Sequence, residues 1–179
     1  GLARLGVAVD AKAASLAGFH GPLMVAGFFG VVISLERAVA AARLWAYAAP
    51  LACGLAGIAI FVGEPSFAAG LATLGAAILA FASFRFVAMQ PEAHTMTIAA
   101  GAVALAAGNL AWYATGQPSA AVPAWAAFLV LTIAGERLEL SRFLPRSTPV
   151  RATFVAIAVA IGASAVFASD PRGARAFGA

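Results

Sequence analysis

Histidine is scarce in this chain, and one of its two histidines lies in a segment that could bind a metal or haem. Residues 20–24 read HGPLM within an apolar run. Imidazole and thioether are ligands for both haem iron and copper, and residues four apart share one face of a helix. Pro22 removes a backbone donor and loosens the helix around Gly18. We therefore predict that His20 and Met24 contact a metal or haem; the alternative is a hydrogen-bonded histidine beside a methionine that fills core space.

Asn109 and the second histidine, His94, are the other polar groups that such a site could use. Counting from the ends of the apolar segments places Asn109 at nearly the depth of His20, where it would orient the imidazole or hydrogen-bond between helices. His94 opens its segment at the opposite face, more than about 10 Å from His20 along the membrane normal. The two histidines therefore cannot share one metal ion, and a site at His20 needs Met24, water or residues outside this sequence. Otherwise His94 is an interfacial or capping residue.

The dipeptide Glu-Arg occurs twice in similar short motifs, both near the same predicted boundary of the membrane. Residues 33–37 read ISLER and residues 133–137 read IAGER. A charge at that depth needs an opposite charge from a neighbouring helix, so we predict crossed ion pairs, Glu36 with Arg137 and Glu136 with Arg37. The predicted polar cluster at this boundary comprises Glu36, Arg37, Arg85, His94, Glu136, Arg137 and Glu139. Glu139 can also pair with Arg142 on its own helix. The cluster as a whole either fixes the helices relative to one another or lines a proton path or an anion-binding vestibule.

The composition excludes an ordinary soluble domain. Of the 179 residues, 63% are hydrophobic and 10% are charged, and the mean hydropathy is +0.96. Soluble domains average about 45–50% apolar and about 25% charged residues. The net charge of +4 comes from dispersed cations without a basic stripe, so no nucleic-acid partner is expected. Cys53 is the only cysteine, which excludes a disulfide framework and a cysteine-based zinc site, and the chain is predicted to be an integral membrane protein of the lipid bilayer.

Six apolar stretches are long enough to cross a bilayer, because a spanning helix needs about 20 residues. They cover residues 14–36, 44–63, 66–89, 93–114, 120–142 and 150–169. Short segments rich in proline, glycine or charge separate them, and Ser66 is expected to cap the third helix. Such short loops make neighbouring helices antiparallel, and the runs lack the alternation of barrel strands. The predicted fold is an all-α, polytopic transmembrane helical bundle that forms a single domain over residues 1–179.

Charge and aromatic residues orient this bundle. Arginines gather where the first, third and fifth spans end, namely Arg37, Arg43, Arg85, Arg137, Arg142, Arg146 and Arg151. The positive-inside rule makes this side cytoplasmic and places both ends of the chain outside. The aromatic residues near span ends are predicted to be interfacial: Trp45, Tyr47, Trp112, Tyr113 and Trp125. Small residues in the first and fourth spans are predicted to allow close helix packing: Gly27, Gly30, Ser34, Gly101, Ala104 and Gly108.

The segment that contains His20 resembles a known family. HGPLM at residues 20–24, GFFG at 27–30 and ISLER at 33–37 are similar to NnrS-type membrane proteins, and GERLEL at 135–140 resembles related uncharacterised membrane proteins. The resemblance implies a bacterial inner-membrane protein of roughly twelve spans, containing haem and copper and linked to nitric oxide metabolism and nitrosative stress. On that basis the sequence is expected to be an excerpt of such a protein, with the missing transmembrane half as its partner. The resemblance also implies that His20 is the residue that contacts the metal or haem.

Two other functions fit the same residues. In a small-solute or ion transporter, the proline-broken first span and His20 would line the pathway and the Glu-Arg cluster would form a gate. In a structural subunit of a membrane complex, the same groups would serve only helix packing. No P-loop, HExxH or GxSxG motif occurs, so no catalytic residue is predicted.

Overall fold

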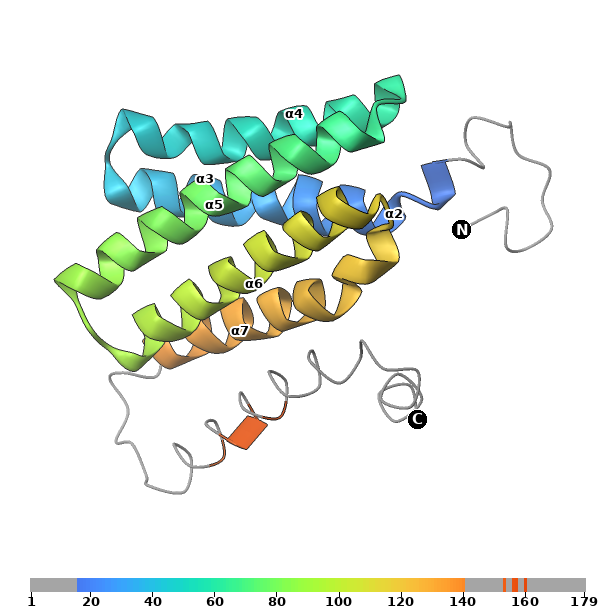
Figure 1. The fold of residues 1–179 in the computed structure, drawn as a ribbon. Coiled ribbons are helices and arrows are strands. Elements are labelled where there is room, and N and C mark those ends of the chain that lie inside the picture. Colours follow the sequence, from blue (N-terminus) through green and yellow to red (C-terminus); the bar gives the residue numbers. More distant parts are fainter. Residues whose placement is uncertain (1–15, 141–152, 154–155, 158–159, 161–179) are drawn as a thin grey trace.

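Helices make up the part of the chain that the structure, a computed structural model, describes: residues 16–140, 153, 156–157 and 160. Five of the helical segments are long and apolar enough to cross a membrane, and no strand occurs among the described residues. They run His20–Ala41, Leu44–Val62, Pro65–Met89, Ala93–Thr115 and Pro118–Leu140. Consecutive segments run antiparallel and pack side by side (Figure 1). The predicted all-α bundle is confirmed.

The first of these segments is irregular. It consists of α2 (His20–Pro22), a π-helix η2 (Leu23–Phe29) and α3 (Gly30–Ala41). Pro22 cannot donate to the carbonyl one turn before it, and the helix widens in the residues that follow. The segment continues past the predicted end at residue 36, because Arg37 finds partners on neighbouring helices. It stops where Ala42 adopts a left-handed conformation with φ of 50°.

The remaining helices begin and end at short turns. They are η3 (Leu44–Tyr47) with α4 (Ala48–Val62), α5 (Pro65–Met89), α6 (Ala93–Thr115), and η4 (Pro118–Ala121) with α7 (Val122–Leu140). Gly63 and Gly116 end α4 and α6 with φ of 92° and 67°, which glycine adopts without steric penalty. Pro65 opens α5 and Glu64 is its N-cap residue, so the expected cap at Ser66 is wrong. The predicted sixth span, residues 150–169, lies almost entirely outside the described residues.

Small side chains allow α3, α4 and α5 to pack closely against one another. α3 packs on both α4 and α5, and α4 packs on α5. Gly30 of α3 and Gly75 of α5 both lie against Cys53 of α4, which is buried. Ser34 is also buried, and its hydroxyl donates a hydrogen bond to the carbonyl of Gly30. The predicted close packing of the first span at Gly30 and Ser34 is confirmed.

The contact between α6 and α7 combines glycines with two indole rings. Gly101 lies against Thr132, and Gly108 lies against Trp125. Trp112 and Trp125 pack edge to face with ring centroids 6.1 Å apart, and both are buried. The prediction that these two tryptophans are interfacial is therefore wrong: both lie inside the bundle, where Gly108 leaves room for the indole of Trp125. The other aromatic residues predicted at the interface are exposed: Trp45, Tyr47 and Tyr113.

Candidate functional site

His20 and Met24 lie one turn apart on the first spanning segment, with their side chains away from the bundle. His20 is exposed and Met24 is 38% exposed, whereas Pro22 and Ala26 on the same segment are buried. Within the described residues, no group of three or more His, Cys, Asp or Glu side chains could hold a metal ion.

Asn109 is fully buried between α5, α6 and α7. Its amide nitrogen donates to the carbonyl of Ala72 in α5 over 2.9 Å. Its side-chain oxygen accepts a hydrogen bond of 2.8 Å from the indole N–H of Trp125 in α7. Both ends of the amide are thus engaged inside the bundle, while the imidazole of His20 lies outside it. The predicted hydrogen bond between helices is thus confirmed, because Asn109 links α6 to both of its neighbours, whereas the orienting role beside His20 stays a prediction.

Arg37 is the centre of the charged cluster at the arginine-rich end, the end of the bundle where α3, α5 and α7 stop. Its Nη2 lies 2.7 Å from Oε1 of Glu136 in α7, which is one of the two predicted crossed pairs. The same nitrogen lies 3.5 Å from Oε1 of Glu36. The guanidinium also lies over the ring of Phe86 in α5, 5.9 Å from its centroid. One side chain of α3, only 11% exposed, therefore contacts both α5 and α7.

The second predicted pair, Glu36 with Arg137, does not form among the described residues. Glu36 contacts Arg37 instead, and Arg137 is exposed. Successive residues of a helix point about 100° apart, so the rotation that aims Arg37 and Glu136 at each other turns their neighbours aside. Glu139 is half-buried, and its predicted partner Arg142 lies outside the described residues.

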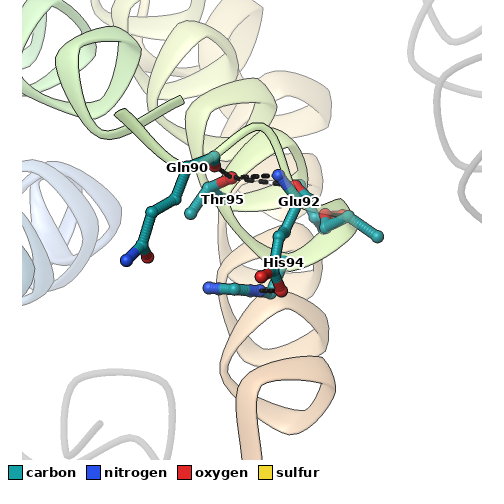
Figure 2. Close-up of polar contacts among 6 residues, drawn as sticks. Gln90, Glu92, His94 and Thr95 are labelled. Atoms are coloured by element: carbon teal, nitrogen blue, oxygen red, sulfur yellow. Dashed lines mark hydrogen bonds and ion pairs between the residues drawn. The ribbon is translucent and has the colours of Figure 1, made fainter. Parts of the chain in front are cut away.

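His94 lies in the first turn of α6, at the end of the bundle opposite to His20, as predicted (Figure 1). The side chain is buried, and Nδ1 lies 3.3 Å from Oε2 of Glu92, without the alignment of a hydrogen bond (Figure 2). The hydroxyl of Thr95 accepts a hydrogen bond of 3.2 Å from the N–H of Glu92 and lies 2.6 Å from the carbonyl oxygen of Gln90. Glu92 and Thr95 form the capping box of α6 and close the turn between α5 and α6, whereas Nδ1 of His94, in the same turn, has no hydrogen-bond partner among the described residues.

Two features of the arginine-rich end were not predicted from the sequence. Thr95 caps α6, and the spacing of Glu92 and Thr95, three residues apart after a proline, is the signal that could have revealed it. Arg85 was expected near the Glu-Arg pairs, but it lines a small pocket together with Arg43 and Trp45. No sequence signal joins these three residues, because α5 approaches the end of α3 only in the folded chain.

The whole sequence matches one family. A family model described as a domain of unknown function, DUF8744, matches residues 1–179. The chain belongs to the DUF8744 family. No curated protein and no solved structure matches it. The description of DUF8744 names no activity, so the function of this domain has to be argued from the two ends of its bundle.

The Arg37–Glu136 contact gives a first test of this geometry. Replacing Glu136 with glutamine should lower the free energy of unfolding by about 1–2 kcal/mol, because the hydrogen bond from Arg37 then lacks the negative charge of the carboxylate. Glu36→Gln removes a longer contact from the same guanidinium, and its carboxylate is more exposed, so its effect should stay below about 0.5 kcal/mol. Unfolding in mixed detergent micelles measures both variants. Equal losses would contradict the assignment of Glu136 as the main partner.

Proposed function

We propose that this DUF8744 domain is an integral protein of the bacterial inner membrane that supplies part of a haem or copper site and acts in nitric oxide metabolism or nitrosative stress. The observation that carries the proposal is the outward position of His20 and Met24 on the first spanning segment. The function itself comes from the resemblance of residues 20–37 to NnrS-type proteins. The positive-inside rule then places the arginine-rich end in the cytoplasm and His20 near the outer face.

An exposed histidine in a spanning segment supports a partner beyond the described bundle. Ionisable groups in a membrane usually face an interior partner or a cavity, because contact with hydrocarbon is unfavourable. Within residues 16–140 His20 has neither, since its side chain is exposed. The adjoining π-helix adds to this argument, because such wide turns occur frequently at functional sites. A second transmembrane part that packs over this face would bury His20 together with Met24.

The spacing of the two side chains restricts how each cofactor would be held. Residues four apart on one helix approach a metal from the same side. Such a pair fits two adjacent positions around copper, for which imidazole and thioether are both suitable ligands. A haem would be held from this helix by the imidazole of His20 alone. Copper would therefore use both His20 and Met24, whereas haem would use only His20.

Metal and haem analysis of the detergent-purified, full-length protein, with an optical spectrum, tests this proposal. A haem site should lose its Soret band in His20→Ala and keep it in Met24→Leu, whereas a copper site should lose metal in both variants. His94→Gln is the matched control, because it removes the other histidine at the opposite end of the bundle. A folded wild-type protein without haem or metal would overturn the proposal. Solute uptake that depends on Glu136 would then identify a transporter.

A further inference from the structure

A second polar feature of the arginine-rich end is a pocket between the end of α3, η3 and the end of α5. Its volume is about 120 Å³, and it is open to the outside of the bundle. Ala41, Arg43 and Trp45 line one side, and Arg85, Phe86 and Met89 of α5 line the other. The left-handed turn at Ala42 reverses the chain after α3 and so brings Arg43 and Trp45 to face α5.

The pocket carries two positive charges without a negative one. Arg43 and Arg85 are exposed, and neither forms an ion pair with any other residue between 16 and 140. Among the described residues, no acidic side chain lines the pocket. Arg37, at the same end of the bundle, contrasts with them because two carboxylates already occupy its guanidinium. Two unpaired guanidinium groups in one concave site favour an anion with several oxygen atoms, since guanidinium binds phosphate through paired hydrogen bonds.

The surroundings of the pocket are those of a membrane surface. Trp45 is 39% exposed and packs edge to face on Phe81 of α5, with ring centroids 5.3 Å apart, which fixes the indole beside the two arginines. Tryptophan is enriched at the depth of lipid headgroups. The large apolar side chains around this corner of the bundle are exposed: Val39, Leu44, Phe81, Phe84 and Met89. A ligand held here would thus have phosphate contacts at one end and hydrocarbon contacts at the other.

We infer that the pocket of Arg43, Trp45 and Arg85 binds the phosphate headgroup of an anionic glycerophospholipid, with the acyl chains along the apolar side of α5. A basic pocket between spanning helices is a known form of lipid headgroup site. The exposed apolar neighbours favour a lipid over a free phosphate ion, which would gain nothing from them. This inference rests on the proposed membrane location and is independent of the haem or copper site.

Tryptophan fluorescence can report directly on this pocket. The chain has three tryptophans, and Trp112 and Trp125 are buried, so a brominated lipid that touches the bundle quenches mainly Trp45. The full chain is reconstituted in phosphatidylcholine nanodiscs that contain a small fraction of brominated phosphatidylglycerol or, for comparison, brominated phosphatidylcholine. We expect stronger quenching by phosphatidylglycerol. Arg43→Gln and Arg85→Gln should each reduce the preference about fivefold, and the double variant about 25-fold.

Three controls make the result decisive. Arg137→Gln removes an exposed charge from the same end without touching the pocket, so the preference should stay. Trp45→Phe should abolish the lipid-dependent quenching, and millimolar inorganic phosphate should not compete. The inference would be overturned if the double variant kept the preference or if Arg137→Gln lost it equally. It would also be overturned if quenching survived Trp45→Phe or if phosphate competed. Lack of quenching by either lipid in wild-type protein would instead refute the membrane location itself.

Discussion

Replacing Gly75 with leucine should lower the free energy of unfolding by about 3 kcal/mol, the largest change that we expect from a single substitution in this bundle. A Cβ atom at Gly75 would lie 2.6 Å from Sγ of Cys53, 3.0 Å from the carbonyl oxygen of Ala49 and 3.2 Å from the backbone nitrogen of Cys53. Two of these neighbours are backbone atoms of α4, which cannot rotate away. The helices α4 and α5 would have to separate, and the buried contacts between them would weaken.

Gly57→Leu is the matched control for this substitution. Gly57 also lies in a spanning helix, but a Cβ there would meet no atom within 4 Å, so the free energy of unfolding should change by less than about 0.5 kcal/mol. A second comparison combines Gly75→Ala with Cys53→Ala, which removes the nearest atom and should restore part of the stability that Gly75→Ala loses. Reversible unfolding in detergent micelles measures the whole set. If Gly75→Leu and Gly57→Leu behave alike, the close approach of α4 and α5 is wrong.

Replacing Asn109 with leucine should lower the free energy of unfolding by about 1–3 kcal/mol, the range for a buried donor left without its acceptor. The leucine keeps nearly the same volume but removes the oxygen that accepts the N–H of Trp125. That N–H is buried among apolar groups and cannot turn to water. The bond from Asn109 to the carbonyl of Ala72 is lost as well, although that carbonyl lies within α5 and can still serve the helix.

A double-mutant cycle with Trp125→Phe isolates this contact. Trp125→Phe removes the donor, so the double variant lacks both partners of the bond and leaves no indole N–H unsatisfied. The two single losses should therefore exceed the loss of the double variant by about 1 kcal/mol. Tyr113→Phe on the same helix is a suitable control, because Tyr113 is exposed and should show no coupling to Asn109. Strictly additive losses would contradict the hydrogen bond between α6 and α7.

The spans could be predicted from the sequence because hydrophobic length and turn residues determine them locally. The observed helices over residues 44–62, 65–89, 93–115 and 118–140 begin and end within two residues of the predicted limits at most of their ends. The first span was predicted to end too early because the charges of Glu36 and Arg37 resemble a boundary. The helix continues to Ala41 since Glu136 and Phe86, distant in sequence, stabilise the guanidinium of Arg37.

Pairings between helices were harder to predict, because they depend on how each helix is rotated. Counting residues placed Asn109 at the depth of His20, but its side chain forms hydrogen bonds with Ala72 and Trp125 of the neighbouring helices. The repeated Glu-Arg dipeptide predicted two ion pairs between α3 and α7, but the rotation of these helices permits only the pair of Arg37 with Glu136 among the described residues. Trp112 and Trp125 lie near span ends and are still buried, and Gly108 on the facing helix leaves room for Trp125. Depth follows from counting residues, whereas rotation requires the packed bundle.

The π-helix over Leu23–Phe29 has a consequence for how this family can change over evolutionary time. A wide turn holds an additional residue compared with an α-helical turn, so a relative with one residue fewer in this stretch can form a regular helix without rotating the flanking parts. The same deletion elsewhere between His20 and Arg37 would rotate one residue by about 100° relative to the other. Gaps in an alignment of the family should therefore concentrate between residues 23 and 29, where the length of the segment can vary while His20 and Arg37 keep their faces.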